Sequence, residues 1–287
     1  MPPRVRLLEV PYDSGHRGTR HGAGPGALVS AGAADRLAAH GADVDHAVVE
    51  LPDGFTGEVA GGVELMRRVA RDVAARPDRL PVVLAGNCGV TLGVVAGLRA
   101  RAPERRVAVL WFDAHGDLQG PSTSTSGFFD GMGLAMATGR CWEALAATVP
   151  GHAALADERV VVVGGHDLDA AERDVLDASA LRLLDVPAVR AGRAGEVLDA
   201  VAARSDAVHV HLDLDVHDTT VARANSYAVP GGLTAHEVRD VVAAAVARMP
   251  LASATVASWD PALDVEHRMR DTALKLLEVL GRATREG

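Results

Sequence analysis

The feature that most constrains the fold is a repeated alternation between short β-branched runs and longer alanine-rich stretches. Runs such as Val107–Phe112 and Val160–Val163 are apolar at every position, which is typical of strands that helices cover on both faces. Strands and helices that alternate through short links predict a largely parallel sheet between two helix layers. The expected fold class is therefore α/β, a three-layer αβα sandwich with a mostly parallel sheet of about eight strands.

The alternation gives boundaries for each expected element. We expect strands over Val5–Val10, Val44–Leu51, Leu80–Ala85, Val107–Phe112, Val160–Val163, Leu181–Val186, Val208–Leu214 and Ser253–Trp259. We expect helices near residues 26–39, 58–75, 91–101, 131–147, 169–178, 191–204, 234–248 and 263–282. Neither a linker nor an internal repeat interrupts the pattern, so residues 1–287 are expected to form a single domain.

Charge and composition exclude several classes of function. The net charge is −9, and the basic residues are scattered, so the sequence predicts neither a nucleic-acid partner nor binding to an anionic membrane. No apolar stretch approaches the ~18 residues that a transmembrane helix needs, and no leader pattern precedes the first strand. Two cysteines, Cys88 and Cys141, are too few for a disulfide framework. We expect a cytoplasmic protein with free thiols.

Polar residues gather where two of the hydrophobic runs stop, and ligands of open α/β sheets bind at such strand ends. One run is followed by Asp113, His115 and Asp117 at alternating positions, and a later run ends in Asp213 and Asp215. Each segment alone could provide turn or helix-cap groups. Carboxylates gathered at one edge repel each other unless cations neutralise them. The sequence therefore predicts a metal site, with donors that suit Mn²⁺, Fe²⁺, Ni²⁺, Zn²⁺ or Co²⁺.

These motifs resemble those of the arginase/agmatinase (ureohydrolase) family. That family carries Asp-Ala-His-x-Asp after one strand and Asp-x-Asp after a later one, and both patterns match in full at residues 113–117 and 213–215. Further landmarks match at 22–25, 123–127 and 230–234. The resemblance implies an αβα sandwich that acts on a small guanidino amino acid. It also implies a homo-oligomer, either a trimer or a hexamer.

The resemblance further implies two divalent cations that share a hydroxide able to attack a guanidinium carbon. Mn²⁺ is the first expectation, with Zn²⁺, Fe²⁺ or Co²⁺ as alternatives. The ligands carried over from the family are Asp113, Asp117, Asp213 and position 88 for one ion, and Asp113, His115, Asp213 and Asp215 for the other.

Position 88 departs from the family pattern. The family has a Gly-Gly-Asp-His turn there, whereas this chain has Gly86-Asn87-Cys88-Gly89. Cys88 could be a small buried thiol with no further role. As a thiolate ligand it would make one ion a weaker Lewis acid and favour Zn²⁺ or Fe²⁺ over Mn²⁺. If the thiol stays protonated, that ion should bind weakly.

Four positions match residues that bind the amino-acid end of the substrate in arginases. Asp169 and Glu172 have the spacing of the pair that holds the α-amino group, although Asp-x-x-Glu at a helix start is also a capping box. Gln119 and Ser126 match residues that contact the α-carboxylate. Phe128 replaces a polar residue there.

The guanidinium end of the expected site differs from the family. Asp130 stands where arginases have a histidine that moves protons, and a carboxyl group with a tuned pKa can do the same work. Ser258 stands where the family has a glutamate that pairs with the guanidinium, and Asp260, two positions on, is a possible replacement. The expected catalytic residues are Asp117, Asp130 and Ser258.

The loss of that glutamate favours a reacting group that is less cationic than guanidinium, because an unneeded buried carboxylate costs stability. The first hypothesis is hydrolysis of Nω-hydroxy-L-arginine to L-ornithine and hydroxyurea. The chain resembles the branch of the family that carries out this reaction, which has cysteine in place of the first histidine ligand, here at position 88. The alternative is arginase or another guanidino-acid amidinohydrolase. An inactive assembly or regulatory subunit is a further alternative, against which the retained ligands argue.

Overall fold

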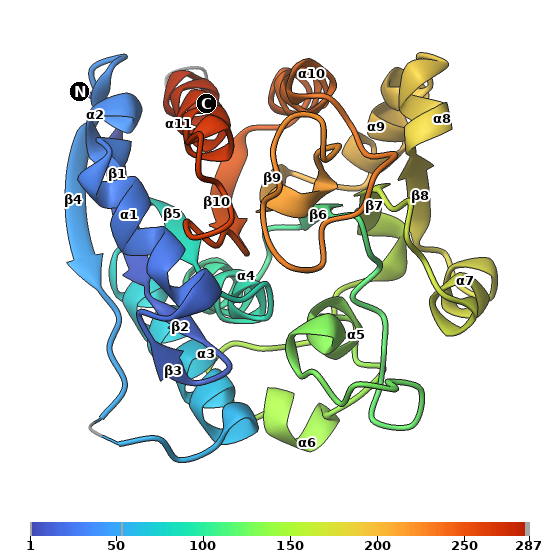
Figure 1. Ribbon diagram of the computed structural model, residues 1–287, viewed down its shortest axis with the longest axis horizontal. Coiled ribbons are helices and arrows are strands. Elements are labelled where there is room, and N and C mark those ends of the chain that lie inside the picture. Colours follow the sequence, from blue (N-terminus) through green and yellow to red (C-terminus); the bar gives the residue numbers. More distant parts are fainter. Residues whose placement is uncertain (1, 53, 285–287) are drawn as a thin grey trace.

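The computed structural model describes residues 2–52 and 54–284. Within them, eight strands form one parallel sheet in the order β4-β1-β5-β10-β9-β6-β7-β8 (Figure 1). The expected αβα fold class is confirmed, and each strand overlaps an expected one. The strands are β1 (Arg4–Val10), β4 (Asp43–Val48), β5 (Leu80–Ala85), β6 (Val107–Phe112), β7 (Val160–Gly164), β8 (Arg182–Asp185), β9 (Ala207–Asp213) and β10 (Leu251–Ala257).

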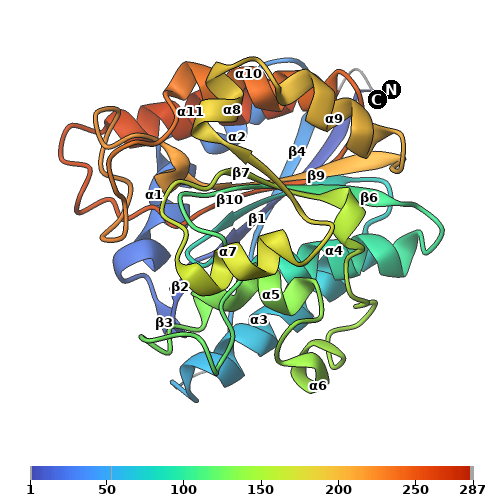
Figure 2. The ribbon, with the colours of Figure 1, turned by 90° about the vertical axis from the view of Figure 1, so that its right-hand side faces the viewer.

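Helices cover both faces of the sheet, as Figure 2 shows from the side. One layer contains α1 (Gly24–Ser30), α2 (Ala33–Ala38), α8 (Val186–Arg190), α9 (Ala194–Ala202), α10 (Ala235–Val246) and α11 (Arg268–Ala283). The other contains α3 (Glu58–Ala75), α4 (Val90–Arg101), α5 (Gly133–Ala137), α6 (Glu143–Ala146) and α7 (Ala170–Asp177). Among the described residues, no helix combines the length and the apolar character needed to cross a bilayer.

Alternation along the strands divides the core between the two layers. On β6, Leu110 and Phe112 pack in the cluster under α10 and α11, whereas Val109 and Trp111 pack against α3 and α4. All four side chains are fully buried. Because each large apolar side chain stabilises the fold by about 1.5–3 kcal/mol when buried, both faces of the strand must be apolar. This explains why β6 lacks the polar alternation of a half-exposed strand.

Two expected helices are interrupted, and several short elements were not expected, among them α8 (Val186–Arg190). The helix expected at 26–39 is divided at Gly32, whose φ of +93° is incompatible with a right-handed helix. The helix expected at 131–147 becomes α5 and α6, separated by the left-handed residues Gly139 and Trp142. Two short strands that were not expected, β2 (Tyr12–Asp13) and β3 (His16–Arg17), form an antiparallel hairpin.

Candidate metal centre and substrate cavity

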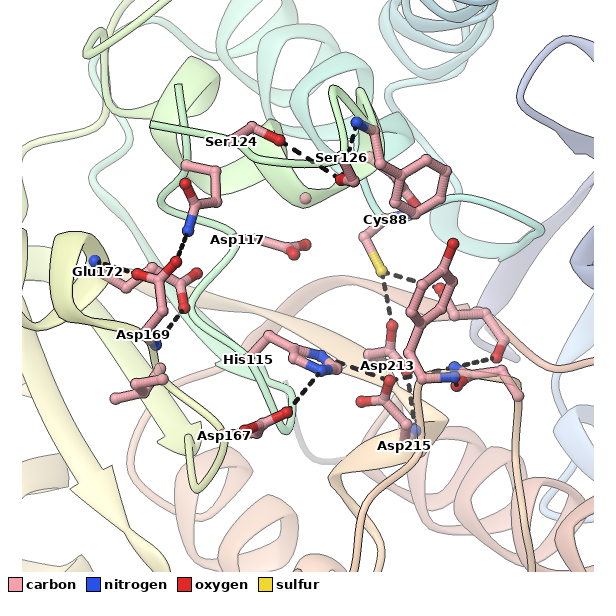
Figure 3. Close-up of a pocket in the computed structure, with 18 of the residues that line it drawn as sticks. Cys88, His115, Asp117, Ser124, Ser126, Asp167, Asp169, Glu172, Asp213 and Asp215 are labelled. Atoms are coloured by element: carbon pink, nitrogen blue, oxygen red, sulfur yellow. Dashed lines mark hydrogen bonds and ion pairs between the residues drawn. The ribbon is translucent and has the colours of Figure 1, made fainter. Parts of the chain in front are cut away.

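The loops that follow the central strands converge on a cavity of about 320 Å³ at the carboxyl edge of the sheet (Figure 3). Asp113 is 1% exposed and is not among the residues that line the cavity, but it accepts a hydrogen bond from the backbone N–H of His115, which does line it. The cavity thus unites segments that are distant in the sequence. The predicted site residues that line it are Cys88, His115, Asp117, Gln119, Ser126, Asp130, Asp169, Glu172, Asp213, Asp215 and Ser258.

The loop after β6 folds around Asp113. The backbone N–H of His115 donates to Asp113 Oδ1 (2.8 Å), and the Nδ1 of the same histidine lies 3.1 Å from that oxygen. Trp111 Nε1 donates to Asp113 Oδ2 (3.1 Å). A left-handed φ of +49° at Asp117 turns the chain, and the buried Oδ2 of Asp117 has no hydrogen-bond partner among the described residues. In Figure 3, Asp117 and His115 point into the same space.

The last residue of β9 and the turn that follows it bring two more carboxylates to that space. Asp213 Oδ1 accepts from the backbone N–H of Asp215 (2.8 Å), which orients both side chains. Asp215 Oδ1 accepts from the N–H of Ala114 (3.2 Å), and this contact joins the loops after β6 and β9. Asp215 Oδ2 accepts from Asn225 Nδ2 (3.1 Å). The two predicted ligand motifs therefore meet directly.

Cys88 enters the cluster from the turn between β5 and α4. The turn needs Gly86, because a Cβ there would lie 2.1 Å from the carbonyl oxygen of Tyr12. Cys88 Sγ donates to Asp213 Oδ2 (3.0 Å) and lies 3.1 Å from Ser258 Oγ. The thiol thus abuts the carboxylates, where its sulfur is placed to bind a cation.

Burial and mutual repulsion disfavour the ionised forms of these groups. Burial, together with the charge of Asp215, raises the pKa of Asp113 to about 7. Burial and the neighbouring carboxylates hold the pKa of Asp117 and of Asp213 well above the usual range. Burial lowers the pKa of His115, but the hydrogen bond with Asp113 and the nearby charges outweigh it and raise that pKa to about 10. Positive charge is what such a cluster needs in order to ionise.

The donor set fits divalent cations. Ligand atoms of Asp113, His115 and Asp215 lie within 4.8 Å of one another, and so do those of Cys88, Asp113 and a third residue, His211. Asp113 belongs to both groups, which agrees with the bridging role expected for it. The unpartnered Oδ2 of Asp117 lies in the same cavity. Carboxylate, imidazole and thiol donors together suit first-row transition metals.

Asp169 and Glu172 lie on the side of the cavity away from Cys88 (Figure 3). They form a complete capping box at the start of α7. Gln119 Nε2 also donates to Asp169, so that aspartate faces the cavity as well as the helix. Glu172 Oε1 accepts from the N–H groups of Gly116 (3.1 Å) and Leu118 (3.3 Å) and so holds the loop after β6. The capping function and the position at the cavity coexist.

Asp130 lines the cavity and also fixes the turn that carries Cys88. Its Oδ2 accepts from the N–H of Cys88 (2.9 Å) and from Asn87 Nδ2 (2.8 Å), and its Oδ1 accepts from the N–H of Gly89 (2.8 Å). Burial raises the pKa of this carboxyl group, and the hydrogen bonds oppose the rise. Both oxygens are therefore occupied by the turn.

Asp130→Ala should destabilise the protein because it removes the acceptor of three hydrogen bonds. An unsatisfied buried donor costs about 1–3 kcal/mol, so we expect the free energy of unfolding in urea to fall by about 3 kcal/mol. Asp130→Asn retains one acceptor oxygen, so its free energy of unfolding should fall by about half as much. Equal and negligible losses in the two variants would show that Asp130 does not fix the turn.

Asp260 is the predicted substrate residue that the structure does not bring to the cavity. The strand β10 ends at Ala257, and Ser258 has a left-handed φ of +61°. Residues 258 and 260 therefore do not share the face that strand periodicity would give them. Asp260 Oδ1 instead accepts from the N–H of Ala262 (2.9 Å). Ser258 itself is 3% exposed and lines the cavity.

The sequence did not point to several cavity residues that lie outside the metal motifs. His21 lies beside the matched glycine landmark, and its Nδ1 has no hydrogen-bond partner among the described residues. The ring of Tyr227 stacks on Phe128, with centroids 5.4 Å apart, and His21 meets it edge-on. Asn225 is buried between Asp215 and the carbonyl oxygen of Ser258. Only adjacency to a matched landmark could have indicated His21.

The fold and the site together define a class of protein: an αβα sandwich with a carboxylate-rich cluster, able to hold divalent cations, at the ends of its strands. The sequence matches the model of the Arginase family over residues 3–281. The chain belongs to the arginase family. The predicted family and enzyme class, an amidinohydrolase, are confirmed.

Individual relatives show how far the similarity extends. An arginase from Brevibacillus brevis is 29% identical over 95% of this chain and 96% of its own. An Nω-hydroxy-L-arginine amidinohydrolase from Streptomyces lavendulae is 32% identical over 61% of this chain and 59% of its own. The crystal structure of arginase from Bacillus cereus superposes with a TM-score of 0.87 at 26% identity, covering 97% of this chain and 98% of that one.

Proposed function

We propose that this protein hydrolyses a C–N bond in the guanidino-type group of an amino acid, with Nω-hydroxy-L-arginine as the preferred substrate and L-ornithine and hydroxyurea as products. The observation that carries the choice of substrate is the uncharged hydroxyl of Ser258, which lines the cavity beside the carboxylate cluster, 3.1 Å from Cys88 Sγ. The relative from Streptomyces lavendulae, which is named for that reaction, supports the proposal.

The chemistry of the substrate explains why this end of the cavity would suit it. An N-hydroxyguanidine is less basic than a guanidine, so it needs no carboxylate dedicated to a cationic nitrogen. Its added hydroxyl can exchange a hydrogen bond with Ser258 Oγ. An additional buried carboxylate would cost stability without binding energy to offset it. Ser258 thus becomes the residue that distinguishes the two guanidino groups.

The opposite side of the cavity suits the amino-acid end. Asp169 would bind the α-amino group, and Gln119, which donates to Asp169, would share the α-carboxylate with Ser126. Glu172 would act by holding the backbone between Gly116 and Leu118. Fixing both ends of the substrate places its central carbon beside the carboxylate cluster, and such positioning lowers the barrier to attack.

We expect the metal ligands to follow the family pattern except at Cys88, with Mn²⁺ expected first. When bound, such cations lower the pKa of water and polarise the group that is cleaved. The chain itself must release protons from Asp113 and His115 for the ligands to bind. Cys88, Asp113, Asp117 and Asp213 would hold one ion, and Asp113, His115, Asp213 and Asp215 the other.

L-Arginine is the second candidate substrate, and one observation favours it. The arginase from Brevibacillus brevis matches 95% of this chain, whereas the Nω-hydroxy-L-arginine amidinohydrolase matches 61%. The two candidates share the amino-acid end and differ only in the group that Ser258 would contact. A direct comparison of rates therefore separates them.

We expect kcat/KM for Nω-hydroxy-L-arginine to exceed that for L-arginine by at least tenfold, a difference of about 1.4 kcal/mol. The measurement is ornithine formation by the metal-loaded protein, with agmatine as the third substrate. A higher kcat/KM for L-arginine would make the protein an arginase. Turnover of agmatine without turnover of either amino acid would contradict the roles of Asp169 and Gln119.

Ser258→Ala tests the proposed contact within the same assay. The loss of one hydrogen bond of about 0.5–1.5 kcal/mol should lower kcat/KM for Nω-hydroxy-L-arginine about two- to tenfold and leave that for L-arginine nearly unchanged. Ser124→Ala is the matched control, since Ser124 lines the same cavity on the side of Ser126. Ser124→Ala should change kcat/KM for both substrates by the same factor.

A further inference from the structure

His211 lies behind the cavity and takes no part in the family ligand pattern. It stands on β9 two residues before Asp213, so both side chains point to the same face of the sheet. The residue is fully buried. One of its ring nitrogens lies within 4.8 Å of a carboxylate oxygen of Asp113 and of Cys88 Sγ. The imidazole is therefore beside the position where this chain lacks a histidine ligand.

The surroundings of His211 hold its ring in a fixed orientation. Its Nδ1 lies 2.8 Å from Thr91 Oγ1, in the first turn of α4. The ring stacks on Trp111 with centroids 3.8 Å apart, and the indole N–H of Trp111 donates to Asp113. If Nδ1–H donates to Thr91, the lone pair of Nε2 is free, and metal-binding histidines are oriented by such a bond from their other nitrogen.

Nε2 of His211 has no hydrogen-bond partner among the described residues. A buried polar atom without a partner is uncommon and requires an explanation. An unpartnered nitrogen is not specific by itself, because His209 Nε2 is also unpartnered. What distinguishes His211 is that its ring lies within 4.8 Å of both Cys88 and Asp113.

We propose that His211 provides an imidazole donor to the cation held by Cys88 and Asp113, and so replaces from inside the sheet the histidine that position 88 has lost. That ion would then be held by thiolate, imidazole and carboxylate, a softer set than carboxylates with one imidazole. Such donors favour Zn²⁺, Co²⁺ or Fe²⁺ over Mn²⁺ at this position. The inference rests on the proposed metal centre and not on which guanidino compound is the substrate.

His209 provides a matched control from the same strand. It is also fully buried, its Nδ1 lies 2.6 Å from Ser253 Oγ, and it precedes His211 by two residues on the same face. It belongs to neither of the donor groups found among the described residues. His209→Asn therefore reports what the loss of a buried imidazole does to the fold alone.

The test compares His211→Asn, His209→Asn and the unchanged protein after loading with Co²⁺ or Zn²⁺. Elemental analysis and competition with a chelating dye give the number and affinity of bound ions, and the Co²⁺–thiolate absorption band reports on Cys88. We expect His211→Asn to lower the affinity for one ion at least 100-fold and to shift or abolish the Co²⁺–thiolate band. His209→Asn should retain both the affinity for that ion and the absorption band. Unchanged affinity and spectrum in His211→Asn, or equal losses in the two variants, would overturn the proposal.

A measurement on the unchanged protein keeps the proposal testable if His211→Asn does not fold. X-ray absorption at the zinc edge counts imidazole ligands in the Zn²⁺-loaded protein. Two histidines, His115 and His211, are expected for the pair of ions, and one alone would contradict the role of His211. Because these readouts are metal content and spectra, a failure to hydrolyse any guanidino compound would count against the proposed function and leave this test intact.

Discussion

Asp213→Asn is expected to reduce hydrolysis of the best guanidino substrate by at least about 10³-fold, a loss of about 4 kcal/mol of transition-state stabilisation. Asp213 is one of two carboxylates expected to serve both ions, and it is the one that also contacts Cys88 Sγ. The amide retains the shape and one acceptor oxygen, so the hydrogen bond from the N–H of Asp215 can remain. Charge and metal binding are therefore lost without a large change in packing.

Elemental analysis of the same preparation distinguishes this explanation from a damaged fold. Metal content should fall by half or more while the far-ultraviolet circular dichroism stays unchanged. Asp264→Asn is the matched control, because Asp264 is 3% exposed, caps the N–H of Arg270 and lies outside the cavity. It should keep full activity when folded. Full activity and full metal content in Asp213→Asn would exclude Asp213 as a ligand.

The sheet and its ligand-bearing edge could be predicted because both depend on local sequence. A strand buried on both faces must be apolar throughout, so the uninterrupted apolar runs alone predicted β6 and β7. Asp113 follows β6 directly and Asp213 is the last residue of β9, so predicting the strands also placed both ligands. Parallel pairing of β6 with β9 then brings the two motifs together.

Other parts of the site depend on backbone geometry and long-range contacts that local sequence does not specify. The left-handed φ at Ser258 directs Asp260 away from the cavity, and strand periodicity gave no sign of that turn. His21 and Tyr227 come from segments about two hundred residues apart and meet only in the folded protein. His211 was hidden because it lies within a strand, where a histidine resembles an ordinary core residue.

The two metal positions were expected to be unequal because Cys88 replaces a histidine, and the structure adds the donor groups and the burial that belong to each position. The group around His115 and Asp215 contains carboxylate and imidazole donors and no thiol. The group around Cys88 contains a thiol whose pKa is raised well above the usual range, first by burial and then by Asp213. A thiol must lose its proton to bind a cation. We therefore expect metal binding at the second position to depend more strongly on pH and on metal identity than binding at the first.

Removal of the cations should destabilise the protein, and increasingly so as the pH rises from 7 to 9. In the metal-free state the pKa of His115 is about 10, against about 6.5 in an unfolded chain. Between these values the folded state binds more protons, so its stability falls with rising pH. The raised pKa values of Asp213 and Cys88 have the same sign, and Cys88 contributes only above the pKa of about 8.5 that a thiol has in an unfolded chain. The buried histidines 209 and 217, with pKa values lowered to about 3 and about 4, oppose this trend only below about pH 6.5.

Bound cations should reverse the effect, because they favour the deprotonated forms of the side chains that bind them. A cation that binds only the folded state also stabilises that state. We expect Tm of the metal-loaded protein to exceed that of the chelated protein by at least about 5 °C at pH 7, with a larger difference at pH 9. Differential scanning fluorimetry of preloaded and desalted samples measures both values. Sodium chloride at matched ionic strength separates site binding from screening, and it should reproduce little of the gain. A chelated protein that becomes more stable from pH 7 to 9 would show that the carboxylate and histidine cluster does not hold the protons assigned to it.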